Sequence, residues 1–265
     1  MVETNTMRIQ YELLLEFFFW GLETFSRRDC ALILAGYHET ATGRRLDELL
    51  DRLRDQGFVE QRGRGSSASF TITDLGRQRA RVTDPSVHWN RSWDGKWRVF
   101  SFDLPVIRRK DRIVLWRALR DHKLGLLQRS VWIWPHEVES LLNQVLQAHG
   151  IPECFCGFEA GRLFLCDNAE VVATAWNWKE ISHQQGAYLN HDVLHPATLG
   201  KAGDLTVLAR LARIERTACQ YAFNFDPLLP RELWPKRYQG SAVEERHRDF
   251  RTRLLRRLRD LTSVH

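Results

Sequence analysis

The sequence of 265 residues predicts an α+β protein of three parts, at residues 1–88, 89–185 and 186–265. In the first part, apolar residues at helical spacing lead into two short strands around a glycine turn. The second part alternates aromatic strands with helices, and the third has helical spacing throughout. We therefore expect an N-terminal winged helix-turn-helix domain, a central ferredoxin-like α/β sandwich and a C-terminal helical domain.

The N-terminal part shows the helix signals of that prediction. Residues 8–25 carry apolar side chains at helical spacing. Ser26 suits the N-cap of a second helix, and Thr42 suits the N-cap of a third, which ends before Gly57. The remaining expected elements are two strands, the basic glycine turn between them and a short helix, at residues 58–62, 69–73, 63–67 and 73–77.

In a winged helix, the third helix enters the major groove and the hairpin reaches phosphates. The candidate DNA contacts are therefore Thr42, Arg44, Arg45, Arg62 and Arg64. Three acidic residues oppose this function, because carboxylates on the outward face of the third helix repel phosphate, although one can accept a hydrogen bond from cytosine. They are Asp47, Glu48 and Asp51. The alternative is a domain that mediates only protein contacts.

The central part begins with a strand that we expect to be buried on both faces. It follows the turn Asp94-Gly95, has five apolar residues between Trp97 and Leu104, and stops at Pro105. The elements expected after it are a helix, a strand, a second helix and a strand pair, at residues 108–119, 128–135, 136–149, 154–160 and 162–166. This order is close to that of a ferredoxin-like sandwich.

Helical spacing dominates the rest of the chain. We expect helices over residues 168–181, 202–221 and 242–261, with a rigid turn at 226–230. The last helix is strongly basic, which is typical of a solvated face and also suits an anionic ligand.

Charge and composition narrow the class of protein. The net charge of +6 favours an anionic partner. Residues 1–88 hold 12 Arg against 13 acidic residues, whereas residues 89–130 hold 11 Lys and Arg against 4 acidic residues. No apolar run is long enough for a membrane span, and the first residues lack a signal-peptide pattern. The five cysteines are scattered, so we expect a reduced, cytoplasmic protein.

Several motifs resemble the PaaX family of transcriptional repressors, named for control of phenylacetic acid degradation. The motifs are Trp93-Asp94-Gly95-Lys96-Trp97-Arg98, Phe102-Asp103-Leu104-Pro105, Ser130-Val131-Trp132-Ile133-Trp134-Pro135-His136, and Asp226-Pro227-Leu228-Leu229-Pro230-Arg231-Glu232-Leu233-Trp234-Pro235 with Gly240. The winged helix and Thr73-Asp74-Leu75-Gly76-Arg77 also match. Two features depart from the family: the acidic third helix, and a segment at about residues 186–205 that matches no family motif.

The resemblance implies a homodimeric repressor that binds a double-stranded DNA operator and is released by an acyl-CoA or aryl-CoA thioester. It also implies a central domain similar to the CRISPR-associated ferredoxin-like endonucleases. Basic clusters at residues 108–120 and 246–259 suit phosphates, and tryptophans suit an aryl group. The candidate effector residues are Arg108, Arg109, Trp132, Trp134, Arg253 and Arg257.

Two rival chemistries use the central residues. In the related endonucleases a carboxylate at the position of Asp103 binds a divalent metal, which makes a metal-dependent nuclease the alternative function. We favour local capping for Asp103, because no second carboxylate has suitable spacing. A zinc site from His149, Cys154, Cys156 and Cys166 also lacks the usual spacing. We therefore expect no catalytic residue, cofactor or metal, and no enzyme activity.

Overall fold

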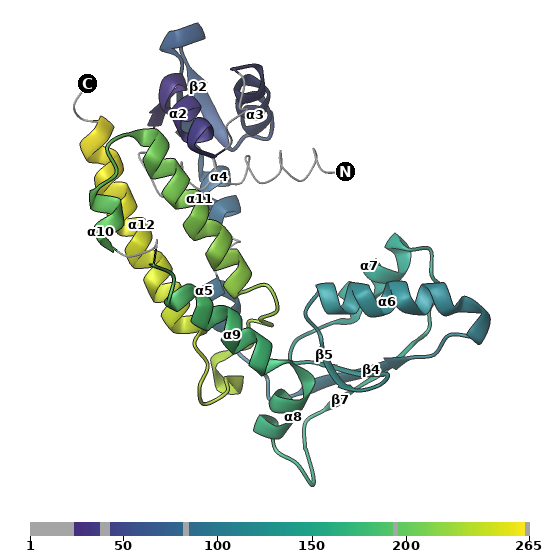
Figure 1. The fold of residues 1–265 in the computed structure, drawn as a ribbon. Helices are drawn as coiled ribbons and strands as arrows, with labels where there is room; N and C mark the ends of the chain where they lie inside the picture. Colours follow the sequence, from purple (N-terminus) through teal and green to yellow (C-terminus); the bar gives the residue numbers. More distant parts are fainter. Residues whose placement is uncertain (1–23, 38–42, 82–84, 193–195, 263–265) are drawn as a thin grey trace. The chain divides into compact units, whose positions relative to one another are not determined.

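The structure is a computed structural model that describes residues 24–37, 43–81, 85–192 and 196–262 (Figure 1). Its contacts divide the chain into two compact units, each described by itself below. One comprises residues 1–84, 187–221 and 241–265, and the other comprises residues 85–186 and 222–240. The three-part division made from the sequence stays a prediction.

The N-terminal residues form two helices followed by an antiparallel hairpin and a further helix. The sheet has three strands in the order β1-β3-β2, and all pairs are antiparallel. In chain order the elements are β1 (Thr24–Ser26), α2 (Arg27–Tyr37), α3 (Gly43–Asp55), β2 (Val59–Arg62), η1 (Gly65–Ser67), β3 (Ser69–Ile72) and α4 (Asp74–Arg81).

The helix cap predicted at Ser26 is confirmed. The Ser26 hydroxyl accepts a hydrogen bond from the Asp29 backbone N–H, and the Asp29 carboxylate accepts one from the Ser26 N–H. At α4 the Thr73 hydroxyl accepts a hydrogen bond from the Gly76 N–H, a cap that was not predicted. The helix expected over residues 8–25 lies outside the described residues except for its end. That end was wrong, because Thr24 and Phe25 pair with β3 as a strand.

The central residues form a four-stranded antiparallel sheet in the order β5-β6-β4-β7. The elements follow each other as β-α-β-β-α-β, the ferredoxin-like order. They are β4 (Trp97–Phe102), α6 (Arg109–Asp121), β5 (Gly125–Gln128), β6 (Val131–Trp134), α7 (Glu139–Ala148) and β7 (Phe155–Ala160). The short helices α5 (Pro85–Trp89) and η2 (Val106–Arg108) stand before β4 and α6.

Two strand predictions in this domain were wrong, one of them in part. The strand expected over residues 128–135 is confirmed only for Val131–Trp134, because Arg129 and Ser130 form a turn, and the strand β5 that precedes this turn and pairs with β6 was not predicted. The strand expected over residues 162–166 is absent, because residues 162 and 163 are irregular and residues 164–166 form bends. Leu165 has a positive φ of 64°, which a strand does not allow, and its side chain is fully exposed.

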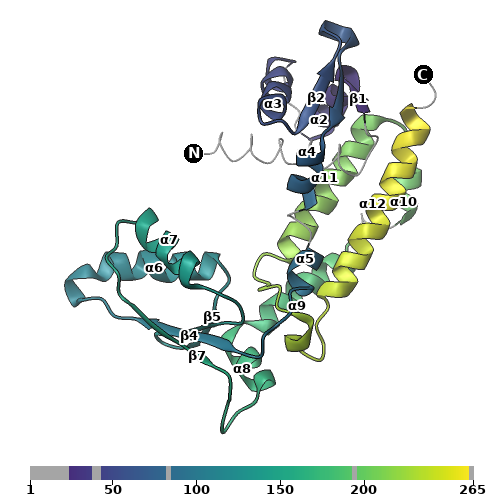
Figure 2. The same ribbon diagram turned by 180° about the vertical axis from the view of Figure 1, so that it is seen from behind.

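Helices lie on both faces of the sheet that contains β4 (Figures 1 and 2), and β4 contributes to a hydrophobic core on each face. On one face, α6 and α7 cover Phe100 and Trp132. On the other face, α8 (Asn168–Ala175) covers Trp97 and Ile133. Trp97 and Phe100 are 1% and 2% exposed, so the expected burial of this strand on both faces is confirmed.

The segment at residues 222–240 also contributes to the core under α8. Leu229 and Leu233 join the cluster that contains Trp97. Asp226 is fully buried and accepts hydrogen bonds from Gln185, Tyr238 and the Leu228 N–H. The Pro- and Leu-rich motif at 226–235 therefore has a structural role in this unit.

The remaining elements are helical. The helix expected over 168–181 is interrupted, because Trp176 is extended and ends α8. The following helices are α9 (Trp178–Leu189), α10 (Pro196–Gly200), α11 (Leu205–Ala222) and α12 (Gly240–Thr262), with the short η4 (Arg231–Leu233) before α12. In the part of the chain that the structure describes, no helix is long and apolar enough to cross a membrane.

Gly125 lies where the end of α8 packs closely against the sheet. A Cβ at this position would lie 2.7 Å from the Trp176 ring and 2.9 Å from the Ala175 Cβ. We predict that Gly125→Ala lowers the free energy of unfolding by about 1–3 kcal/mol through overpacking. Gly161→Ala is the matched control, since its nearest neighbour is the Lys96 Cγ at 3.8 Å. Urea unfolding followed by tryptophan fluorescence measures both variants, and equal stability of the two would contradict the prediction.

Candidate functional site

The tip of the β2–β3 hairpin presents two arginines on a closed turn. Gly63 and Gly65 have φ values of 79° and 60°, which allow the reversal. The Ser67 hydroxyl donates to the Arg64 carbonyl at 2.9 Å, and the Gln61 amide donates to the Gly63 carbonyl at 3.1 Å. Arg62 and Arg64 are exposed, and within the described residues neither guanidinium group has a hydrogen bond or ion pair. These guanidinium groups are available to an anion.

The acidic residues of α3 are exposed, as expected, but arginines contact several of them. Arg27 donates to both carboxylate oxygens of Asp47, at 2.8 and 2.9 Å. Arg54 lies 2.8 Å from Asp51 and 3.3 Å from Asp55. Because these arginines offset part of the negative charge, the outward face of α3 repels phosphate less than its carboxylates alone suggest.

The other candidate DNA contacts are less defined. Arg44 and Arg45 fall in the first turn of α3, as predicted, but their side chains are not among the described ones. Thr42 lies outside the described residues.

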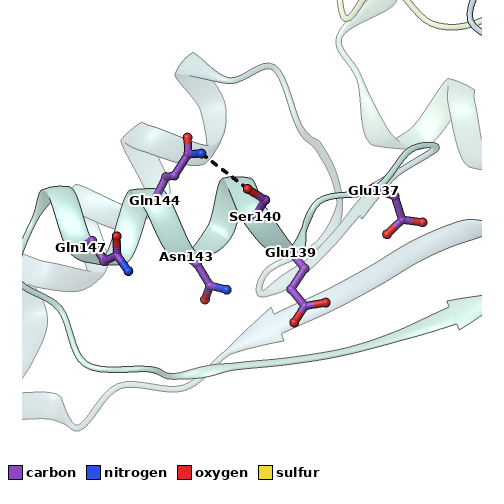
Figure 3. A pocket seen from close by; sticks show the side chains of 6 residues that line it. All are labelled: Glu137, Glu139, Ser140, Asn143, Gln144 and Gln147. Atoms are coloured by element: carbon purple, nitrogen blue, oxygen red, sulfur yellow. Dashed lines mark hydrogen bonds between the residues drawn. The ribbon is translucent and has the colours of Figure 1, made fainter.

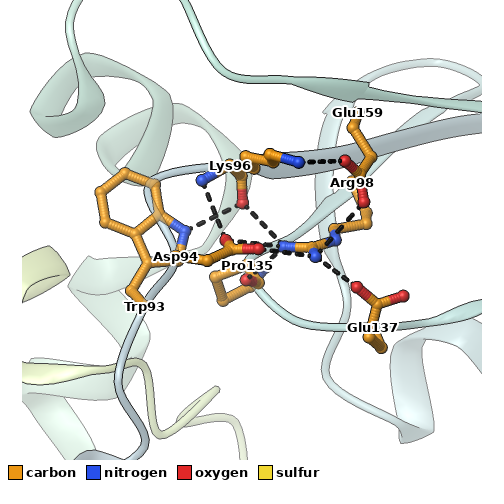
Figure 4. Close-up of polar contacts among 7 residues, drawn as sticks. All are labelled: Trp93, Asp94, Lys96, Arg98, Pro135, Glu137 and Glu159. Atoms are coloured by element: carbon orange, nitrogen blue, oxygen red, sulfur yellow. Dashed lines mark hydrogen bonds and ion pairs between the residues drawn. The ribbon is translucent and has the colours of Figure 1, made fainter.

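The motif at residues 93–98 builds a polar network around Arg98 (Figure 4). Arg98 donates to both oxygens of Asp94 at 2.8 Å, and it also donates to Glu137 and contacts Glu159 at 3.4 Å. Lys96 donates to Glu159 at 2.8 Å. The Arg98 side chain is 11% exposed, so it joins the ends of β4, β6 and β7 from a largely buried position.

The network changes the acidity of its members. Hydrogen bonds from Arg98 and from the Lys96 backbone lower the pKa of Asp94 to about 2. The hydrogen bond from Lys96 lowers the pKa of Glu159. Both carboxylates are thus stabilised in their charged form, which indicates a structural role in place of acid–base chemistry.

Two hollows lie along α7, and both are rich in carboxylates. The first has a volume of 570 Å³ and an apolar floor that includes Phe100, Phe155 and Leu142. Its charged rim consists of Arg98, Glu137, Glu139, Glu153 and Glu159. The second, of 520 Å³, follows the outer side of α7 and is lined by Glu137, Glu139, Ser140, Asn143, Gln144 and Gln147 (Figure 3). The one cation on these walls, Arg98, already has carboxylate partners, so neither hollow suits the phosphates of a CoA.

The structure places the candidate effector residues in different environments. Trp132 is fully enclosed in the core and packs against Trp116, and Trp134 is half-buried. Arg109 is exposed on α6, whereas Arg108 pairs with Asp111 at 2.5 Å.

The two candidates on α12 have partners within their own unit. Arg253 pairs with Asp249 at 2.8 Å. Arg257 donates to the Ala202 carbonyl at 3.0 and 2.7 Å. Arg253 is the more exposed of the two, and Arg257 holds the chain before α11.

The structure also describes the residues considered for a metal-dependent nuclease and for a zinc site. Asp103 is exposed after β4, and its backbone N–H donates to the Cys154 carbonyl at 3.2 Å. Cys156 and Cys166 are exposed, and Cys154 is half-buried. Within the described ranges, one group of three residues could hold a metal ion, and it includes neither Asp103 nor any of these three cysteines.

That group, Glu215, Cys219 and His247, was missed from the sequence. The spacing of Glu215 and Cys219 places both on one face of a helix, which was a usable signal. Nothing in the nearby sequence indicates that His247 joins Glu215 and Cys219, because His247 lies on a different helix. The Arg98 network was also not predicted, although Asp94, Lys96 and Arg98 all lie in the motif at residues 93–98.

Fold and sequence comparisons now identify the central domain. Residues 90–172 match the family model described as PaaX protein central Cas2-like domain. The chain therefore carries a Cas2-like domain of the PaaX type, which confirms this part of the resemblance.

A solved structure shares the overall fold. It is "Uncharacterized protein Rv0674 from Mycobacterium tuberculosis", with 21% sequence identity and a TM-score of 0.53, and the match covers 89% of this chain and 90% of that chain. No curated protein matches the sequence.

The Asp94–Arg98 pair makes stability depend on pH. The pKa of Asp94 is about 2, below its ordinary value of 3.8, so the pair stabilises the folded state fully above pH 3.8 and loses this effect as the pH falls through 2. We predict that Asp94→Asn lowers the melting temperature at pH 7 and that the difference from the parent narrows between pH 3.8 and 2.

The control for this measurement is Asp121→Asn, which removes an exposed carboxylate at the end of α6. Calorimetric melting of the three proteins across this pH range checks the prediction. A constant difference between Asp94→Asn and the parent at every pH would contradict it.

Proposed function

We propose that this protein is a ligand-responsive, DNA-binding transcriptional regulator of the PaaX type, and that it acts as a repressor. The Cas2-like central domain of the PaaX type supports the proposal. So does the order of the N-terminal elements, in which two helices precede an antiparallel hairpin, as in a winged helix-turn-helix.

The observation that carries the DNA-binding function is the hairpin tip with its exposed Arg62 and Arg64. Phosphate contacts supply most of the affinity for DNA, and exposed guanidinium groups without carboxylate partners are suited to make them. The neighbouring helix α3 would then lie in the major groove with Thr42, Arg44 and Arg45 toward the bases. The pairing of Asp47 with Arg27 and of Asp51 with Arg54 reduces the repulsion that this helix would otherwise meet.

The regulator is proposed to be a cytoplasmic homodimer without enzyme activity. One winged helix reads a short sequence, so two half-sites about one helical turn apart, or a multiple of that, give the required specificity. Strand β7 pairs with β4 on one side only and exposes Phe158, which makes the central sheet a suitable contact between protomers.

The proposed effector is an acyl-CoA or aryl-CoA thioester. The exposed basic residues Arg109, Lys110 and Arg117 on α6 suit its phosphates, in contrast to the acidic hollows along α7. The exposed Trp116, with the Arg120 guanidinium 5.2 Å from its ring centre, offers an aromatic surface beside them.

The hairpin can be tested by titrating duplex DNA selected by the protein from a random pool. We predict that Arg62→Ala and Arg64→Ala weaken binding to all sequences and lower the salt dependence by about 0.9 for each phosphate contact that is lost. Replacing Arg44 or Arg45 with Ala should instead relax sequence preference, by about 1–3 kcal/mol at one base pair.

Arg129→Ala is the control, because this exposed arginine lies at the β5–β6 turn. Gel-shift titration at several salt concentrations, with footprinting for the two half-sites, gives the readout. Unchanged binding in all four N-terminal variants would refute the proposal.

The effector can be tested by calorimetry with a panel of acyl-CoA and aryl-CoA thioesters and the matching free acids. We predict that one thioester binds and lowers DNA affinity at least about tenfold, which requires about 1.4 kcal/mol of preference for the DNA-free state. Arg109→Ala should weaken thioester binding, and Arg64→Ala should not. A thioester that binds without changing DNA affinity would exclude it as the effector.

A further inference from the structure

Helices α11 and α12 enclose a cluster of three different metal-ligating side chains. Glu215 and Cys219 lie four residues apart on α11, so they share one face of that helix. His247 faces them from α12, and one ligand atom of each residue lies within 4.8 Å of the others. Glu215 is 3% exposed and Cys219 is 9% exposed. The cluster is therefore buried between the two helices.

Hydrogen bonds hold the three side chains in place. The His247 Nδ1 lies 2.7 Å from the Glu215 Oε1, which also accepts a hydrogen bond from the Tyr188 hydroxyl. On the other side of the ring, the Arg251 Nη1 lies 3.1 Å from the His247 Nε2. The imidazole is thus oriented by a carboxylate on one nitrogen and a guanidinium on the other.

These contacts decide the proton positions. The Nδ1 of His247 faces the Glu215 carboxylate, which accepts a proton from it in a hydrogen bond. The Arg251 guanidinium can only donate, and it therefore requires a lone pair on Nε2. A neutral ring with its proton on Nδ1 satisfies both contacts, and we assign this state to the metal-free cluster.

We propose that Glu215, Cys219 and His247 form a binding site for a divalent metal ion of the zinc class. A carboxylate, a thiolate and an imidazole are ligands that zinc accepts, and three protein ligands leave a fourth position for solvent. Bond lengths of about 2.0–2.3 Å place tetrahedral ligand atoms about 3.3–3.7 Å apart, so shifts of about 1 Å bring the present atoms into place. The glutamate and thiolate charges together neutralise the ion.

Binding requires two proton movements. The Cys219 thiol loses its proton to solvent as the sulfur bonds the metal, so one proton is released for each ion bound. The His247 proton moves from Nδ1 to Nε2 as Nδ1 takes the metal. Nε2 then becomes a donor, and Arg251 can no longer donate to it. Arg251 therefore competes with the metal for the same imidazole.

The test uses the full-length protein, stripped with a chelator and titrated with Co²⁺, whose bond to thiolate absorbs in the near ultraviolet. We predict one Co²⁺ per chain, displaced by Zn²⁺, with one proton released per ion. Cys219→Ser should abolish the thiolate band, and His247→Gln should weaken binding by more than about tenfold. Arg251→Ala should strengthen binding, because it removes the competing donor.

Cys156→Ser is the matched control, because this thiol is exposed on β7 and should leave the band unchanged. Circular dichroism establishes that each variant is folded, and if His247→Gln does not fold, Cys219→Ser and Arg251→Ala still decide the result. Absence of a thiolate band in the parent protein would overturn the proposal. So would a band that Cys156→Ser removes, or weaker binding in Arg251→Ala.

Discussion

Burial of strand β4 on both faces is the constraint on which the central domain depends. Trp97 points into the core under α8 and Phe100 into the core under α6 and α7, and both are almost completely buried. A buried aromatic side chain removes about 150–250 Å² from water, worth at most about 4–6 kcal/mol at about 25 cal/mol per Å². An exposed ion pair contributes about 0.2–1 kcal/mol. Aromatic packing therefore supplies the stability, and the charged groups around it supply orientation.

The Arg98 network shows that orientation. Asp94 at the turn, Glu137 after β6 and Glu159 on β7 all contact one guanidinium, so the strand ends are held in register at the edge of the sheet. The most distinctive motif of the sequence is thus part of the framework. The same holds for the motif at residues 226–235, whose leucines complete the core under α8. Residues that identify this fold need not be the residues that bind its ligands.

Charge divides the surface of the central domain. The exposed face of α6 carries Arg109, Lys110 and Arg117, whereas the hollows along α7 are lined by glutamates. An anionic effector is therefore favoured on α6 and disfavoured at α7, a distinction that net charge alone does not make. On α3, Arg27 contacts Asp47 and Arg54 contacts Asp51. This helix therefore repels phosphate less than its carboxylates alone suggest.

Local features of the sequence predicted most elements and several of their ends. The cap at Ser26, the two-sided burial of β4 and the helices α6 and α7 follow from the spacing of apolar residues and from hydrogen bonds within a few residues. The errors arose where pairing with a strand elsewhere in the chain decides the local structure. Thr24 and Phe25 form a strand by pairing with β3, and residues 125–128 form the unpredicted strand β5 by pairing with β6.

The sequence by itself determined which segments are helical or extended and which residue types carry charge, because helix periodicity and turn chemistry are local. Only the tertiary structure decided which side chains meet. Asp94 and Glu159 converge on Arg98 through strand pairing, and Glu215 meets His247 because α11 packs beside α12. Residues that are far apart along the chain become neighbours through burial of apolar faces, and that packing has no signature within a short window of sequence.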